Sequence, residues 1–270
     1  IRIRKLNNIY AYLTFLKYKI MPSTSETGHA KNIANFEDLI SFCNGYGASY
    51  NPSKDSLTIA KLKDLQNTAK DILLQTKTTK TSFDNATNAR QIAFKDLKPL
   101  ATKIVNALAV SGATNLVVAD AKTINRKIQG AKANGNAKVP TTPADPNAPA
   151  PTDKTISTSQ QSYDSIIDHL TKLVETITQE PSYKPNETEL KTDTIKARLD
   201  TMKNTNTELI NSYTNWSNTR IQRNATLYSP LTGLVQTALE VKKYVKSVFG
   251  ATSPQYKQVS GLVFNVIKTQ

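Results

Sequence analysis

Apolar residues recur along this chain at the three- and four-residue spacing of amphipathic helices. The clearest examples are two stripes spaced i, i+3, i+4, i+7, namely Phe36, Leu39, Ile40 and Cys43, and then Leu170, Leu173, Val174 and Ile177. This spacing places apolar side chains on one helical face and predicts that both faces are buried, with Cys43 in the core. We expect the first helix to end at Asn44 and Gly45 and its counterpart to end before Pro181.

A long interval without glycine or proline follows each stripe. One interval begins at Ser53 and the other at Asn186, and we expect one helix of ~40 residues, or ~60 Å, in each. Ser53 and Asn186 are the predicted N-caps, and Glu189 would complete a capping box with Asn186. The threonine-rich stretch at residues 76–82 allows a break in the first long helix, but the sequence favours a continuous one.

Shorter helices complete each half of the chain. Pro99 and Pro230 suit the first turn of a third helix, where a missing N–H costs little. Gly112 and Gly250 predict the turns between this helix and a fourth. Each half is therefore expected to form an antiparallel unit of about four helices, one of them much longer than the rest.

The two halves resemble each other at a nearly constant offset. At offset 133 the matches are Tyr50 with Tyr183, Leu57 with Leu190, Leu62 with Ile195, Phe83 with Trp216 and Arg90 with Arg223. Further along, at offset 131, Pro99-Leu100 matches Pro230-Leu231 and Ala107-Leu108 matches Ala238-Leu239. The sequence thus predicts an all-α protein of two tandem antiparallel helical bundles related by internal duplication.

Domain boundaries follow from composition. Residues 130–156 are rich in proline and poor in apolar side chains, which predicts a Pro-rich linker. We therefore place helical repeat 1 at residues 21–129 and helical repeat 2 at residues 157–270. Met21 opens a segment typical of a natural start, so residues 1–20 are interpreted as an upstream or non-native extension.

Charge is the first pointer to a partner. The 270 residues include 35 basic and 21 acidic side chains, a formal net charge of +14, which favours anionic partners. Only 9 residues are glycine, which favours long helices over glycine-rich catalytic loops. No run approaches the ~18 consecutive apolar residues of a membrane-spanning helix.

Basic residues near aromatic rings are the candidate contacts with an anionic partner. An arginine on an apolar stripe must find a partner or extend its guanidinium to water. For Arg90 and Arg223 we favour a structural ion pair or packing against aromatic rings, with an anion site as the alternative. Rings beside cations are also typical of nucleic-acid binding, although core packing is favoured for them here. The candidates are Arg90, Arg220, Arg223, Lys242, Lys243 and Lys246.

Catalytic and metal-binding patterns are weak. His29 is interpreted as a polar surface residue, and His169 has no identifiable serine or cysteine nucleophile as its partner. No glycine-rich phosphate loop and no metal-ligand spacing is present in the sequence. We therefore expect no enzyme activity, no metal and no small-molecule cofactor.

Three segments carry a resemblance to a known family. They are the run Ser25-Glu26-Thr27-Gly28-His29-Ala30-Lys31-Asn32 with Asn35-Phe36-Glu37-Asp38-Leu39-Ile40, the Tyr-x-Pro pair at Tyr50 and Tyr183, and the stretch Leu239-Glu240-Val241-Lys242-Lys243-Tyr244 with Phe249-Gly250-Ala251-Thr252. From Met21 to the C-terminus the chain resembles a family of bacterial hypothetical proteins built from two tandem helical repeats. The resemblance implies the architecture and a bacterial origin, and it implies no activity and no site residue.

Two classes of function remain open at this point. The first is a binding or scaffolding protein whose two similar bundles contact a protein or a nucleic acid, because two linked weak sites gain apparent affinity. The alternative is a membrane-active or surface-associated helical protein. The single cysteine and the absence of a clear signal segment lead us to expect a cytoplasmic location.

Overall fold

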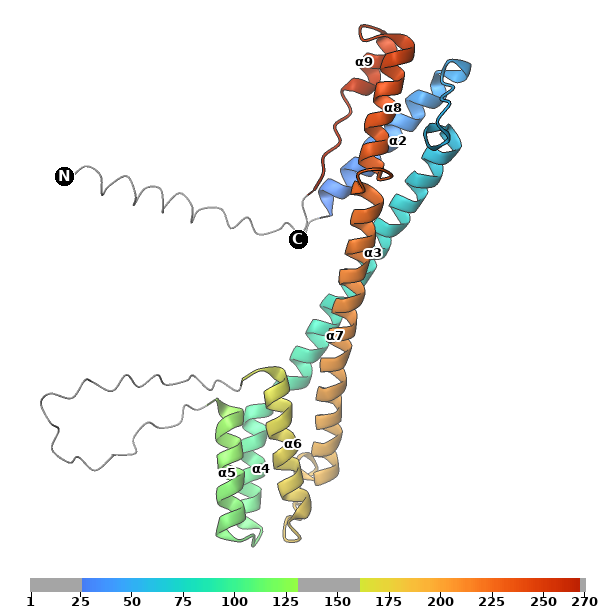
Figure 1. Ribbon diagram of the computed structural model, residues 1–270. Helices are drawn as coiled ribbons and strands as arrows, with labels where there is room; N and C mark the ends of the chain where they lie inside the picture. Colours follow the sequence, from blue (N-terminus) through green and yellow to red (C-terminus); the bar gives the residue numbers. More distant parts are fainter. Residues whose placement is uncertain (1–25, 131–160, 268–270) are drawn as a thin grey trace, which may run out of the picture. The chain divides into compact units, whose positions relative to one another are not determined.

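The fold is built from α-helices and short 3₁₀ turns. The computed structural model describes residues 26–130 and 161–267, and no strand occurs within these ranges, so the all-α prediction is confirmed (Figure 1). The first half contains α2 (Thr27–Gly45), α3 (Ile59–Phe94), α4 (Leu97–Val110) and α5 (Asn115–Gln129). The second half contains α6 (Tyr163–Gln179), α7 (Thr192–Tyr228), α8 (Leu234–Phe249) and α9 (Pro254–Ser260). The predicted extension at residues 1–20 and the predicted linker, apart from Gly130, lie outside the described residues.

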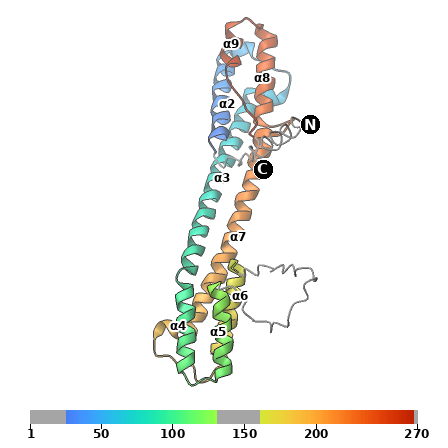
Figure 2. The ribbon, with the colours of Figure 1, turned by 90° about the vertical axis from the view of Figure 1, so that its left-hand side faces the viewer.

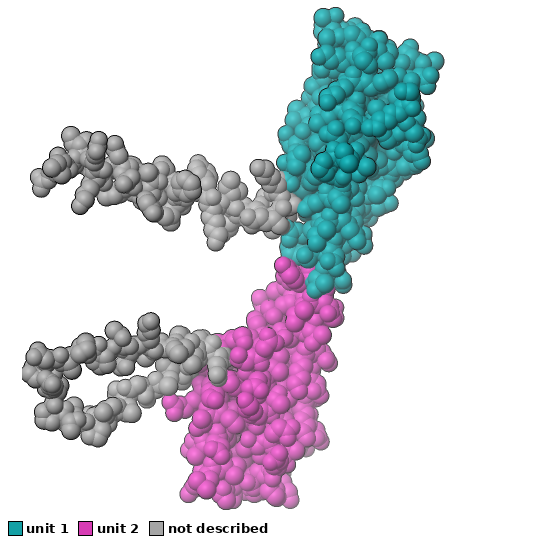
Figure 3. All heavy atoms as spheres, viewed as in Figure 1, with its two compact units in different colours: residues 1–81, 214–270 teal, residues 82–213 magenta. Residues whose placement is uncertain are grey.

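Two compact units divide the chain differently from the two predicted repeats. Unit 1 comprises residues 1–81 and 214–270, and unit 2 comprises residues 82–213 (Figure 3). The boundaries at residues 21–129 and 157–270 therefore do not delimit the folded units, because each unit combines segments from both halves. Helices α3 and α7 each contribute one part to unit 1 and the other part to unit 2.

The core of unit 1 contains the apolar stripe of α2 together with apolar residues of α7 and α8 from the second half of the chain. Phe36 and Leu39 of α2 are fully buried in one cluster with Val241 of α8 and Leu227 of α7. Figures 1 and 2 both show α2 beside α8. Cys43 also lies in this core, as predicted, and burial raises the pKa of its thiol to about 12.

The core of unit 2 contains the second stripe. Leu170 and Leu173 of α6 are buried with Ile104 of α4, Ile128 of α5 and Met202 of α7. α4 has 14 residues, about 21 Å of helix, and is therefore too short to return along the 36 residues of α3 to α2. In unit 1, α8 packs against α2 of the first half, whereas in unit 2, α6 of the second half packs chiefly against α5, which in turn packs against α4.

The long helices are continuous but begin later than predicted. α3 starts at Ile59 and α7 at Thr192, each after a 3₁₀ turn, η2 (Asp55–Leu57) or η3 (Thr188–Leu190). Ser53 and Asn186 are therefore not their N-caps. A tyrosine fastens each turn instead: Tyr50 donates its hydroxyl to the carbonyl of Leu57 at 2.7 Å, and Tyr183 does so to Leu190 at 2.9 Å.

The third helices confirm one proline prediction and contradict the other. Pro99 lies in the first turn of α4, whereas Pro230 lies in the turn that precedes α8. The glycine turns are as predicted, since Gly112 and Gly250 follow α4 and α8 with φ of 95° and 90°. At both positions a glycine avoids the strain that a Cβ would introduce at positive φ.

Candidate functional site

Arg90 of α3 is held inside unit 2 by an aromatic ring and an amide. Its guanidinium carbon lies 3.8 Å from the centre of the Tyr163 ring, at the start of α6, and its Nη1 donates to Oδ1 of Asn206 at 3.1 Å. Asn206 in turn donates to Asp164 at 2.8 Å. The aromatic packing interpretation of Arg90 agrees with these contacts, while its Nε is buried without a hydrogen-bond partner among the described residues.

Arg223 of α7 is the most deeply buried of the six candidates, with 1% of its surface exposed. Its Nη1 forms an ion pair with the carboxylate of Glu26, the N-cap residue of α2. Its Nε and Nη2 donate to Oδ1 of Asn224 at 3.2 and 2.8 Å. A buried guanidinium with a carboxylate and an amide oxygen is a satisfied structural group, and this geometry matches the ion-pair interpretation.

His29 belongs to the same buried cluster, so its prediction as a surface residue is wrong. It is 1% exposed, and its Nδ1 lies 2.6 Å from the hydroxyl of Tyr228. Asn32 donates to the same hydroxyl at 3.3 Å, which leaves the hydroxyl proton for Nδ1 of a neutral imidazole. Burial, and then the charge of Arg223, lower the pKa of His29 to about 4. The ring is therefore neutral near pH 7.

The remaining candidates lie in unit 1, and they differ in the contacts that their charged groups make. Arg220 lies 4.9 Å from the centre of the Trp216 ring. Lys242 donates to the carbonyls of Ser260 and Leu262 at 2.9 and 2.8 Å, and burial lowers its pKa. It fastens the C-terminal segment to α8.

Lys243 and Lys246 of α8 are exposed. Lys246 lies 5.6 Å from the centre of the Tyr256 ring of α9, and neither lysine forms an ion pair among the described residues. Of the six predicted contacts, these two therefore keep the most accessible positive charge. The structure does not bring the six together, because Arg90 lies in unit 2 and the others lie in unit 1.

A groove in unit 2 was not predicted. It has a volume of about 660 Å³ and lies between the C-terminal part of α4 and the segment that precedes α7. Ala107, Val110, Tyr183, Lys184 and Pro185 are among its lining residues. The 86% exposed side chain of Val110 gives it an apolar rim.

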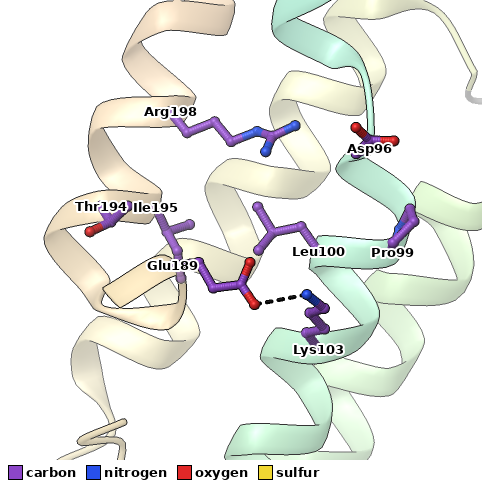
Figure 4. Close-up of a pocket in the computed structure, with 8 residues that line it drawn as sticks. All are labelled: Asp96, Pro99, Leu100, Lys103, Glu189, Thr194, Ile195 and Arg198. Atoms are coloured by element: carbon purple, nitrogen blue, oxygen red, sulfur yellow. Dashed lines mark hydrogen bonds and ion pairs between the residues drawn. The ribbon is translucent and has the colours of Figure 1, made fainter. Parts of the chain in front are cut away.

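A smaller cavity of about 170 Å³ adjoins this groove and shares Lys103 with it (Figure 4). Lys103 pairs with Glu189 at 2.7 Å. The predicted capping box of Glu189 with Asn186 does not form, because Asn186 is not the N-cap of α7. Arg198 donates to the main-chain carbonyl of Lys95, and its Nε is buried without a hydrogen-bond partner among the described residues. Asp96, on the opposite wall, adopts φ 59° and ψ 15°, in the left-handed region.

Sequence reasoning missed these residues for different reasons. Glu26 and Arg223 are 197 positions apart, so no local pattern links them. The two residues between α3 and α4 gave one available signal, because an aspartate in a very short connection suits the left-handed conformation that Asp96 adopts. The groove is formed by α4 and the segment that precedes α7, which are far apart in the sequence, so no local pattern indicates it.

Comparison with known proteins leaves the fold and the side-chain geometry as the basis for a functional proposal. No family model, no curated protein and no solved structure matches this chain. Among the described residues, no helix is long and apolar enough to cross a membrane, and no group of three or more His, Cys, Asp or Glu side chains is placed to hold a metal ion.

Proposed function

We propose that this chain is a non-enzymatic binding or scaffolding protein whose unit 1 contacts an anionic partner through α8. Exposed positive charge on α8 is the observation that carries the proposal. Lys243 and Lys246 are three residues apart, so they lie on neighbouring positions of one helical face. Both side chains are exposed, whereas the preceding lysine, Lys242, donates to main-chain carbonyls within unit 1.

The surrounding sequence leaves this charge uncompensated. Residues 214–267 contain six basic side chains and a single acidic one, Glu240. Glu240 is engaged by Lys54 at 2.6 Å, and the pKa of its carboxyl is lowered chiefly by that contact. Residues 161–213 of unit 2 have the opposite balance, with nine acidic and six basic side chains. An anionic partner is therefore expected to bind at α8 of unit 1 rather than at residues 161–213 of unit 2.

The aromatic residues at α8 favour electrostatic binding of the partner over stacking of nucleic-acid bases. Tyr244 packs edge-on against Tyr50, and Phe249 packs against Tyr46, with ring centroids 5.3 and 5.1 Å apart. Rings that are used in packing are not available as a stacking platform. We therefore expect binding to depend on salt and little on nucleotide sequence.

The test is fluorescence anisotropy with the full chain and three labelled probes: single-stranded RNA, duplex DNA and a polyglutamate peptide. We expect binding at physiological salt that weakens as salt rises. The double variant Lys243→Gln/Lys246→Gln should reduce the salt slope for DNA by roughly 2, because each phosphate contact contributes about 0.9. The probe that binds most tightly identifies the class of partner.

A matched control separates a local contact from a change in net charge. Lys196 and Lys203 of α7 are exposed lysines of unit 2, and Lys196→Gln/Lys203→Gln removes the same charge. This control should bind as the unmodified chain does. Equal losses in both double variants, or no binding of any probe at physiological salt, contradict the proposal. The proposed location remains the cytoplasm, on the basis of the sequence alone.

A further inference from the structure

Helix α4 of unit 2 and helix α8 of unit 1 share a burial pattern, and this pattern indicates which of their residues correspond. α4 begins at Leu97 and α8 at Leu234, so the helices align at an offset of 137. At this offset five of the six buried residues of each helix coincide: Leu97 with Leu234, Leu100 with Thr237, Ala101 with Ala238, Ile104 with Val241 and Leu108 with Val245. The sixth buried residues, Val105 of α4 and Val235 of α8, do not match each other. Ala107 of α4 therefore corresponds to Tyr244 of α8, and not to Ala238 as the sequence match had placed it.

In unit 1, Tyr244 fills the space beside the tyrosine that fastens the 3₁₀ turn. Its ring meets that of Tyr50 edge-on, with centroids 5.3 Å apart and planes at 89°. Its hydroxyl accepts the main-chain N–H of Asn51 at 3.2 Å. The ring and the hydroxyl of one phenol are thus both recognised, by an aromatic edge contact and a backbone donor.

In unit 2 the same recognition elements are present, but no second tyrosine is among the described residues that line the groove. Tyr183 takes the place of Tyr50 and Lys184 the place of Asn51, and both line the groove of about 660 Å³. Ala107 stands where Tyr244 stands in unit 1. The main-chain N–H of Lys184 donates to no protein acceptor among the described residues.

An ion pair supports the correspondence of the two sites. In unit 2, Lys103 of α4 pairs with Glu189 at 2.7 Å. In unit 1, Glu240 stands at the position of Lys103, and it pairs with Lys54 at 2.6 Å. The helix and the turn are therefore bridged at the same helical position in both units, with the charges reversed, so the space next to the bridge is bounded in the same way.

We propose that the groove of unit 2 binds the phenol ring of a tyrosine side chain presented by a partner protein. The ring lies edge-on against Tyr183, over Ala107, and its hydroxyl accepts the N–H of Lys184. A bound phenylalanine side chain would cover that N–H without accepting a hydrogen bond from it, so the groove selects tyrosine. This site is separate from the lysines of α8, and it does not depend on the anionic partner proposed above.

The test uses the uniformly ¹⁵N-labelled full chain and N-acetyl-L-tyrosinamide as the probe, followed by amide chemical shifts. We expect a saturable shift of the Lys184 amide at millimolar probe, and at least fivefold weaker binding of N-acetyl-L-phenylalaninamide. Ala107→Tyr should supply the ring from within the chain and weaken probe binding at least tenfold. Ala109→Tyr makes the same substitution at an exposed position of α4 that does not line the groove, and it should bind normally.

The reciprocal variant asks whether unit 1 contains a hidden copy of the same site. Tyr244→Ala should open the space beside Tyr50, so the amide of Asn51 should then respond to the probe. No saturable shift at Lys184 in the unmodified chain overturns the proposal. Binding to Ala107→Tyr as strong as to Ala109→Tyr overturns it as well, and this outcome does not depend on whether Tyr244→Ala folds.

Discussion

Arg223 and Glu26 lie 197 positions apart in the sequence and form an ion pair inside unit 1. Arg90, the counterpart of Arg223 at offset 133, contacts Tyr163 at the start of α6. Each arginine therefore meets the beginning of the first helix of the other half. The two contacts differ in chemistry, because one partner is a carboxylate and the other an aromatic ring.

Loss of Arg223 should destabilise the fold strongly. Arg223→Ala leaves the partly buried carboxylate of Glu26 without its counter-charge, and breaking a buried pair from one side costs about 3–5 kcal/mol. The free energy of unfolding in urea, followed by circular dichroism, measures the loss. The double variant Arg223→Ala/Glu26→Ala should lose less free energy of unfolding than the two single variants lose when their losses are added.

Arg90→Ala is the matched comparison. Arg90 is only half-buried, and its ring partner is neutral, so we expect a loss of about 1–2 kcal/mol. A cost for Arg223→Ala no larger than that of Arg90→Ala would show that the Glu26 pair adds no stability. The ordering of the two variants thus tests whether charge burial or packing dominates.

The helices themselves were predictable because their signals are local. The stripe of Phe36, Leu39 and Cys43 and the absence of glycine and proline from α3 are properties of neighbouring residues. What covers an apolar face is not local. The stripe of α2 packs on Val241 of α8, and its spacing carries no information about which half of the chain supplies that partner.

The candidate sites were predictable only where the chemistry of a single residue type requires a partner. An arginine on an apolar stripe requires a partner, and Arg223 has one, but its identity as Glu26 has no sequence signal. The correspondence of Ala107 with Tyr244 was missed because the identical Ala107-Leu108 and Ala238-Leu239 pairs suggested an offset of 131. The turn before α8, which contains Pro230, is longer than the connection before α4, so the burial patterns of the two helices match best at an offset of 137.

Stability should fall between about pH 6.5 and pH 4 because of His29. Burial and the nearby Arg223 lower the pKa of folded His29 to about 4, against 6.5 in the unfolded chain. Within this window the unfolded state binds the extra proton, so the free energy of unfolding decreases as the pH falls, by at most about 3 kcal/mol. Arg220 adds to the shift, whereas Glu26 opposes it.

His29→Asn isolates this contribution. An asparagine offers an oxygen near the position of Nδ1 to accept from Tyr228, but it does not titrate. Urea unfolding at half-unit pH intervals should show a flatter profile from pH 6.5 to 4 in this variant. His169→Asn serves as the control for the second histidine, whose pKa burial also lowers. An unchanged slope in His29→Asn excludes His29 as the titrating group.

Separate halves of the chain should not fold alone. Each core draws on both halves, since Phe36 and Val241 belong to one buried cluster in unit 1, and Ile104 and Leu170 belong to one in unit 2. Two fragments divided between residues 145 and 146 should therefore associate when co-expressed and elute together in size-exclusion chromatography. A fragment of residues 21–145 that unfolds cooperatively as a monomer, at the stability of the full chain, contradicts the exchanged arrangement.

The left-handed backbone at Asp96 gives a final test, because it is imposed by a connection of only two residues between α3 and α4. Aspartate and asparagine tolerate this conformation better than alanine, whose Cβ makes it cost about 1–2 kcal/mol. We therefore expect Asp96→Ala to lower the free energy of unfolding in urea, whereas Asp96→Asn should leave it within about 0.5 kcal/mol. Asp96→Gly removes the Cβ and should be at least as stable as Asp96→Asn, because the glycine needs no strain to reach φ 59°. If alanine proves as stable as asparagine and glycine, the connection adopts another backbone conformation and Asp96 contributes no strain.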